Sequence, residues 1–279
     1  MRKTKLTYSN EAELEFICKG VEQSLMSGKY KFTKTRTTGT AKYQTKNEQI
    51  LILPGNNELA GANARFVGSI KKHFKASQLP ERISDERPFY EYFVPISTYT
   101  ELKNICEVDI NGAYWESAYE LGYISKDLYK SAETVSKKAR LIALGVLGKK
   151  TAVSVFEPPY SEIETTEHYE RERVFWDNIV WNLGETIRDV TSRYKPHIFG
   201  IWFDAIFCTK SSANNIRRYL QRRGYETKIK QTRSYVITPR DGIAEGAKIE
   251  RIFMDGTRKE MDVTYTRKKT MDQFLESIK

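Results

Sequence analysis

Two aspartates occupy positions where a charge is costly. Asp109 comes near the end of the apolar segment 105–110, and Asp204 lies between the apolar segments 198–203 and 205–209. A carboxylate in such a place must be hydrogen-bonded or bind a cation. A structural interpretation makes the two residues a helix cap and a turn residue. A chemical interpretation makes them the ligands of two Mg²⁺ ions, for which Mn²⁺ can substitute, in a phosphoryl-transfer site.

The charge of the chain indicates a polyanionic partner. The chain contains 46 Lys and Arg residues and 36 Asp and Glu residues, which gives a formal net charge of +10. Segment 29–46 has six basic residues, no acidic ones and three aromatic rings, and segment 210–240 has nine basic residues and one acidic one. Such segments suit a nucleic-acid backbone, with aromatic rings available to stack on bases, although a basic solvated surface is the alternative. From them we expect nucleic-acid contacts by Lys31, Lys34, Arg36, Arg217 and Arg218.

The elements that must position these residues form an α+β pattern of helices, strands and hairpins without regular βαβ repeats. The first 80 residues predict a small basic α/β module that binds nucleic acid, followed by a linker near 78–88. Its expected elements are a helix over 10–27 capped by Asn10 with Glu13, a hairpin within 29–46, a strand over 50–53 and a helix over 58–75.

The rest of the chain predicts a denser succession of elements. The expected strands are 105–110, 151–156, the two segments around Asp204, 227–237 and a hairpin over 248–265 that turns at Asp255-Gly256. The expected helices are 111–122, a long one from about Ser125 to Gly148, another over 168–194, one over 211–224 and a short one at the end.

Four short segments resemble the motifs of family B DNA polymerases, in the family's order. EVDINGAYWESA (107–118) resembles motif A, and ARLIALGVLGKK (139–150) resembles motif B. GIWFDAIF (200–207) resembles motif C, and TRSYVI (232–237) resembles the K-x-Y motif that contacts the primer. The likeness spans about 105–237 and is closest to the protein-primed branch of phages and mobile elements.

The resemblance implies a fold: a polymerase-like palm with short fingers over 81–240 and a rudimentary thumb over 241–279. It also implies template-directed DNA synthesis from deoxynucleoside triphosphates by two metal ions. Asp109 and Asp204 would be the catalytic metal ligands, with the carbonyl of Ile110 assisting. Other replication proteins are further candidate partners, and we expect a cytoplasmic location, that of the host if a phage encodes the protein.

The resemblance also assigns roles to residues outside the metal site. Tyr114 would lie under the sugar, while Arg140, Lys137 and Gly148 would bind the incoming nucleotide. The primer strand would be gripped by Lys228, Lys230, Arg233 and Tyr235.

Departures from the family's motifs leave two other hypotheses open. Motif C has Trp202 in place of the first aspartate, and motif B has Arg140 in place of lysine and lacks Asn-Ser. These losses favour an inactive palm that serves as a DNA-binding replication accessory. A third hypothesis is an unrelated basic α+β protein, in which Asp109 and Asp204 would lie far apart.

Other classes of protein are disfavoured by what the sequence lacks. Before Asp109 the only aspartate is Asp85, and no D-x-E occurs there, so we expect no proofreading exonuclease. Three separated cysteines favour a reducing compartment over a disulfide framework, and three scattered histidines disfavour a zinc site. No apolar run approaches the roughly 18 residues of a membrane span.

Overall fold

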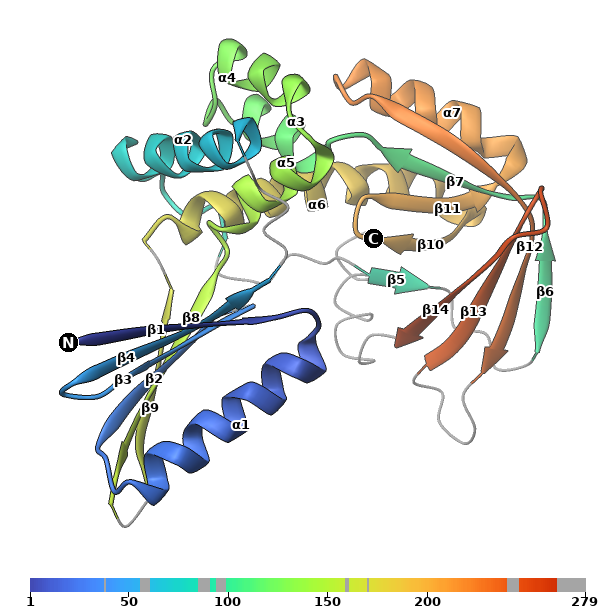
Figure 1. The fold of residues 1–279 in the computed structure, drawn as a ribbon. Coiled ribbons are helices and arrows are strands. Elements are labelled where there is room, and N and C mark those ends of the chain that lie inside the picture. The colour runs from blue at the N-terminus through green and yellow to red at the C-terminus, as the bar shows by residue number, and fades with distance from the viewer. Residues whose placement is uncertain are drawn as a thin grey trace. The chain divides into compact units, whose positions relative to one another are not determined.

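A computed structural model describes most of the chain (Figure 1). The described residues are 1–37, 39–55, 61–84, 91–93, 99–158, 161–169, 171–239 and 246–264. The short helix expected at the end of the sequence lies outside them. The chain forms two compact units, one of residues 1–81 with 130–176 and the other of residues 82–129 with 177–279.

The two units divide the chain differently from the domains expected from sequence. The boundary at 81 falls within one residue of the expected one, but residues 130–176 group with the N-terminal residues rather than with the expected palm. The reason is strand pairing, because Phe32–Thr37 aligns with Thr151–Phe156 over six residue pairs. The hairpin expected to form a thumb likewise continues the sheet of the second unit.

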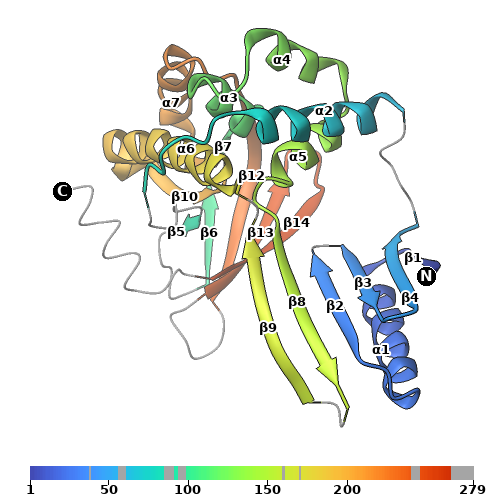
Figure 2. The ribbon, with the colours of Figure 1, turned by 90° about the vertical axis from the view of Figure 1, so that its left-hand side faces the viewer.

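The first unit is built on a six-stranded sheet with the order β1-β4-β3-β2-β8-β9 (Figure 2). Its strands are β1 (Arg2–Tyr8), β2 (Phe32–Thr37), β3 (Thr40–Gln44), β4 (Glu48–Pro54), β8 (Lys150–Glu157) and β9 (Ser161–Tyr169). Only the β1–β4 pair is parallel among the pairs described. The expected hairpin within 29–46 is therefore confirmed as β2–β3, whereas β1 and β9 were not predicted.

Helix α1 (Glu11–Ser27) covers this sheet through an apolar stripe that includes Leu14 and Cys18. Its expected cap is confirmed, because the Asn10 side chain accepts a hydrogen bond from the Glu13 N–H at 2.9 Å. Reciprocally, the Glu13 carboxylate accepts one from the Ser9 N–H at 2.7 Å. Two polar groups at the helix start are thereby satisfied by local contacts alone.

Other helices differ in extent from those expected. The long helix expected up to Gly148 is divided into α4 (Lys126–Ser131), a 3-10 turn (Ala132–Thr134) and α5 (Lys137–Gly145). The division falls at Ser136, whose extended backbone and side chain cap α5 by accepting the Ala139 N–H at 3.1 Å. Helix α2 (Ala62–Ala76) also belongs to the first unit. Helix α6 (Arg173–Tyr194) begins later than predicted, since β9 takes up the residues before it.

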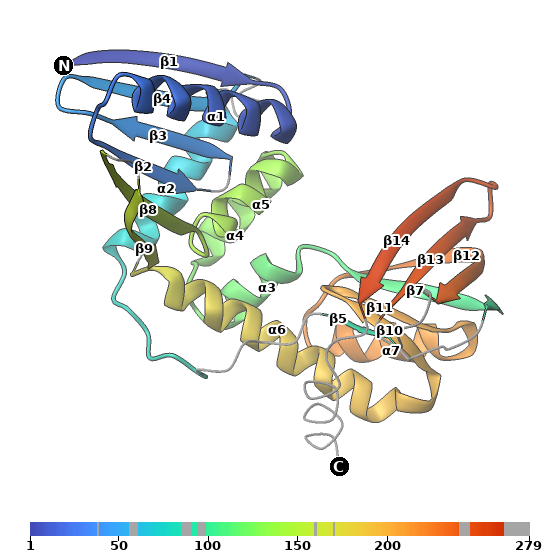
Figure 3. The same cartoon turned by 90° about the horizontal axis from the view of Figure 1, so that it is seen from below.

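The second unit is built on an eight-stranded antiparallel sheet with the path β14-β13-β12-β7-β11-β10-β5 (Figure 3), and β6 pairs with β12 beside this path (Figure 1). Its strands are β5 (Glu91–Phe93), β6 (Thr100–Lys103), β7 (Ile105–Ile110), β10 (Ile198–Trp202), β11 (Ala205–Thr209), β12 (Thr227–Pro239), β13 (Gly246–Phe253) and β14 (Arg258–Thr264). The expected hairpin is confirmed as β13–β14, with Gly256 at a φ of 82° in its turn.

The centre of this sheet has a β-α-β-β-α-β topology. With residues 130–176 of the first unit left aside, the chain runs from β7 through α3 (Ala113–Glu120) and α6 to β10 and β11, and then through α7 (Lys210–Arg222) to β12. In space the four strands lie in the order β12-β7-β11-β10, the arrangement of a split βαβ fold. Helices α6 and α7 cover one face, where Leu183 and Ile216 join alternate residues of β7 in a buried core.

The three cysteines are free and buried. Burial is the main cause that raises the pKa of the Cys208 thiol to about 11. Over the part of the chain that is described, no helix is long and apolar enough to cross a membrane.

Candidate functional site

Asp109 lies near the end of β7, and Asp204 lies in the turn that leads into the neighbouring strand β11. Asp109 near the end of β7 is aligned with Ala205, the first residue of β11. The N–H of Ile110 donates a hydrogen bond to the carbonyl of Asp204 at 3.0 Å, which joins the two positions through the backbone. Both carboxylates are partly exposed. The wide separation expected from coincidental motif matches is therefore not found.

Asp204 belongs to a tight turn. Strands β10 and β11 are joined by Phe203 and Asp204 alone, and Trp202 is aligned with Ala205 across the turn. The favoured two-residue hairpin turns have a positive φ at the first turn residue, and Phe203 has a φ of 53°. The turn thus presents the Asp204 side chain at the end of the hairpin, beside the end of β7.

Side chains along β7 point alternately to the two faces of the sheet, which determines the residues that share a face with Asp109. Cys106, Val108 and Ile110 point into the core under the helices, so Glu107 and Asp109 point to the opposite face. On the adjacent strand β12, Lys228 is aligned with Asp109 and Lys230 with Glu107. Two carboxylates and two ammonium groups therefore share one face of the sheet.

Lys230 connects the two carboxylates of β7. Its Nζ lies 2.7 Å from Glu107 Oε1 and 2.8 Å from Asp109 Oδ2. Burial acts to lower the pKa of Lys230, but its hydrogen bonds to Asp109 and Glu107 outweigh this effect, so the pKa is raised. Lys230 is therefore a cation throughout the neutral pH range.

Glu107 is a member of the site that sequence reasoning missed. Its side chain is only 4% exposed, and its other oxygen, Oε2, accepts from the Arg251 guanidinium of β13. A buried carboxylate is stable only when it is paired in this way. The period of two along β7 could have placed Glu107 beside Asp109, but Arg251 is 144 residues away.

The donor set of the site fits Mg²⁺. This ion is usually bound by one or two carboxylates together with water and substrate phosphates. Asp109 near the end of β7 and Asp204 in the turn before β11 supply two carboxylates, whereas no group of three or more His, Cys, Asp or Glu side chains able to hold a metal occurs in the described ranges. Ile110 was expected to assist through its carbonyl, and its side chain is buried in the core. Substrate oxygen atoms would have to complete the coordination.

Tyr235 requires a correction. It was expected to grip the primer, but it is fully buried, and its ring lies 5.7 Å from that of Phe207 and 6.1 Å from that of Phe199. The register of β12 against β13 shifts between Thr232 and Ser234, so that Tyr235 turns inward. Burial raises its pKa, in keeping with a core position.

The other expected DNA contacts in this unit are divided between the two faces of the sheet. Lys228, Lys230 and Arg233 are exposed on β12. Arg217 and Arg218 lie on α7, which covers the face opposite Asp109. Tyr114 on α3 is partly buried and packs against the core of that helix-covered face.

The basic residues expected to bind DNA in the first unit are paired with its own carboxylates. Lys31 forms an ion pair with Glu157, and Lys34 pairs with Glu22 at 2.7 Å. Arg36 pairs with Glu15, and its Nη1 lies 3.0 Å from the Cys18 sulfur. Sequence reasoning missed these partners because they lie on elements other than β2. Contact of the three residues with DNA stays a prediction, and it would compete with these pairs.

Apart from Tyr114, the residues expected to bind nucleotide lie in the first unit. Lys137 is exposed and Arg140 partly buried on α5, one turn apart. Gly148 follows α5, and its carbonyl accepts from the Arg173 guanidinium at 3.3 Å. A Cβ at Gly148 would lie 2.7 Å from the Trp176 ring, so packing alone accounts for a glycine here.

This contact predicts opposite effects of alanine at two nearby glycines. Gly148→Ala should lower the free energy of unfolding by about 1–3 kcal/mol, because the methyl group would displace the Trp176 indole. Gly145→Ala should instead be neutral or stabilise by about 0.5–1 kcal/mol, because nothing lies within 4 Å of its Cβ in α5. Urea denaturation of both variants checks this pair, and equal effects would contradict it.

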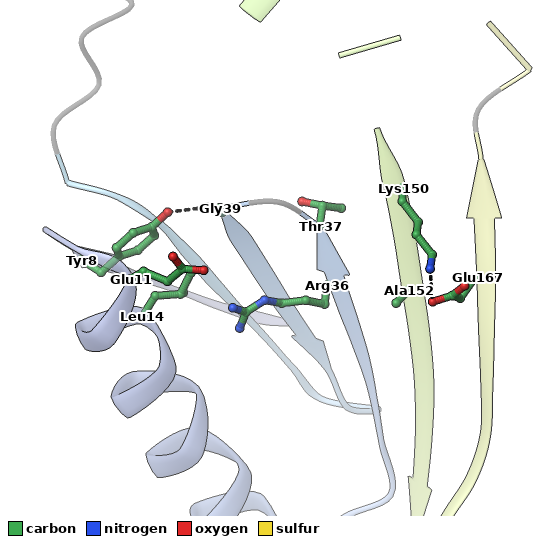
Figure 4. Close-up of a pocket in the computed structure, with 9 residues that line it drawn as sticks. All are labelled: Tyr8, Glu11, Leu14, Arg36, Thr37, Gly39, Lys150, Ala152 and Glu167. Carbon is green, nitrogen blue, oxygen red and sulfur yellow. Dashed lines mark hydrogen bonds and ion pairs between the residues drawn. The ribbon is translucent and has the colours of Figure 1, made fainter. Parts of the chain in front are cut away.

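A cavity of about 580 Å³ lies within the first unit (Figure 4). Its lining includes Tyr8 on β1, Glu11 on α1 and Arg36 on β2. The Tyr8 hydroxyl donates to the carbonyl of Gly39 at 2.8 Å, and Lys150 is paired with Glu167. Charges of both signs and internal pairing give this cavity no preference for one class of ligand.

The sequence matches no known protein family, and a search of curated proteins found no match.

Proposed function

We propose that this protein is a template-directed DNA polymerase of minimal family B type, without proofreading. The observation that carries the proposal is the alignment of Asp109 on β7 with the start of β11, next to Asp204. Two carboxylates at adjacent strand ends are what nucleotidyl transfer by two metal ions requires. The β-α-β-β-α-β topology supports the proposal as a palm, because it brings the motif A and motif C segments together.

The chain's own residues would orient the reactants. Asp109 and Asp204 would hold Mg²⁺, which would activate the primer 3′-hydroxyl and stabilise the leaving pyrophosphate. Lys228, exposed and aligned with Asp109, would bind a backbone phosphate beside the reacting end. Tyr114, in the same unit as the two aspartates, would lie under the sugar of the nucleotide. Contact of Arg140 and Lys137 with the triphosphate stays a prediction from the resemblance. The substrates would be primed DNA and deoxynucleoside triphosphates, with action in the cytoplasm beside other replication proteins.

A second candidate function is a DNA-binding replication accessory that has lost catalysis. The observation that favours it is the ion pair of 2.8 Å between Lys230 and Asp109, which gives this aspartate a structural role without any metal. Trp202, at the place of the first motif C aspartate, points in the same direction.

Primer extension tests the proposal. The full chain is incubated with a primed DNA template and each deoxynucleoside triphosphate, with Mg²⁺ and then with Mn²⁺. We expect incorporation of the nucleotide complementary to the template base. Salt-sensitive DNA binding without extension under either metal would replace the proposal with the accessory function. The absence of both DNA binding and primer extension would overturn both candidate functions.

A further inference from the structure

The turn beside Asp204 carries an exposed aromatic ring. Phe203 is 38% exposed in the turn between two buried strands. Its ring meets that of Trp202 edge to face, with centroids 5.5 Å apart and planes at 86°. One face of the hairpin end is thus aromatic, next to the position proposed for catalysis.

The backbone at Phe203 is strained. Among the described non-glycine residues, only Lys29, Asn104 and Phe203 have positive φ angles. Asn enters this region readily, whereas a bulky aromatic side chain does so at a cost. A glycine or asparagine would form the same turn without strain. Strain kept at one position beside a candidate site points to a role for the side chain itself.

We infer that the Phe203 ring is a stacking platform for the terminal base of the primer strand. The inference rests on the proposed function, which places the primer end at Asp204, the next residue. A base stacked on an aromatic ring is held without regard to its identity, as a templated enzyme requires. Lys228, which is exposed on the same sheet face as Asp109, would attract a backbone phosphate of the primer strand.

A fluorescent primer end tests the contact directly. The probe is a primer–template with 2-aminopurine as the 3′-terminal base, whose emission changes on stacking. Phe203→Leu, which keeps an apolar side chain without a π face, should bind about tenfold more weakly, the loss of one base–aromatic stack. It should also abolish the emission change. Phe16→Leu is the matched control, because Phe16 is 78% exposed on α1 of the other unit, and it should behave as the wild type.

A second variant separates stacking from a structural role. Phe203→Asn suits the positive φ and should raise the melting temperature by about 2–4 °C while weakening binding of the same probe. If Phe203 only packs against Trp202, the substitution would lower the melting temperature and leave binding unchanged, which would overturn the inference.

The outcomes distinguish this inference from the proposed function. An emission change that depends on Phe203, without primer extension, would sustain the stacking contact and reject the polymerase. Extension by the wild type, with binding and emission unaltered in Phe203→Leu, would overturn the stacking contact alone. Absence of probe binding by the wild type at low salt would overturn both.

Discussion

Asp109→Asn and Asp204→Asn should each lower the rate of templated primer extension by about 10³-fold. Asparagine keeps the shape of the side chain and removes the charge that holds a divalent cation. A bound metal ion supplies several kcal/mol of transition-state stabilisation, and about 4 kcal/mol corresponds to three powers of ten in rate. Because β7 and β11 lie side by side, the loss of either carboxylate should lower the extension rate to a similar extent. Single-turnover extension at saturating Mg²⁺ measures the effect.

The control for this prediction is Asp189→Asn. Asp189 lies on α6, is 53% exposed and is paired with Arg223 on α7, on the helix-covered side of the sheet. Its substitution should leave extension within about twofold of the wild type, because exposed ion pairs contribute little. Circular dichroism of each variant checks whether the fold is retained. Extension above a tenth of the wild-type rate in both active-site variants would refute the two-metal assignment.

Glu107→Gln should lower the free energy of unfolding by about 3 kcal/mol. The side chain of Glu107 is only 4% exposed and that of Arg251 is 20% exposed, so loss of the carboxylate charge would leave a largely buried guanidinium unpaired. Lys230, 43% exposed, contributes less because water screens it and Asp109 remains its partner. Urea denaturation followed by tryptophan fluorescence measures the change.

Two further variants make this second prediction specific. Glu250→Gln on β13 is the matched control, because its partner Arg258 is 65% exposed, and it should cost about 0–1 kcal/mol. The double variant Glu107→Met with Arg251→Met removes both charges and should recover most of the stability. A double variant as unstable as the sum of the two single ones would contradict a role through charge pairing.

The local elements of this protein are predictable from its sequence. The cap of α1 depends on Asn10 and Glu13, three residues apart, and the β13–β14 turn depends on Asp255 and Gly256. The hairpin around Asp204 follows from two apolar runs that flank one polar residue. In each case the interacting groups are close in the chain, so residue type and spacing are sufficient.

The surroundings of the candidate site depend on pairings that are distant in the chain. Lys230 meets Glu107 across 123 residues, and Arg251 meets it across 144. Tyr235 is turned inward by a register shift between β12 and β13, which no pattern within its own strand indicates.

From the sequence alone follow the α+β class, the basic character and the position of two aspartates at strand ends. Only the tertiary structure decides that these aspartates are neighbours, that Glu107 and Lys230 accompany Asp109, and that residues 130–176 join the first unit. The physical reason is that strand register and charge pairing arise between segments that are far apart in the chain, from 96 residues for Asp109 and Ala205 to 144 for Glu107 and Arg251. Local periodicity determines which face of a strand is apolar, whereas the partner of that strand is selected by the packing of the whole unit.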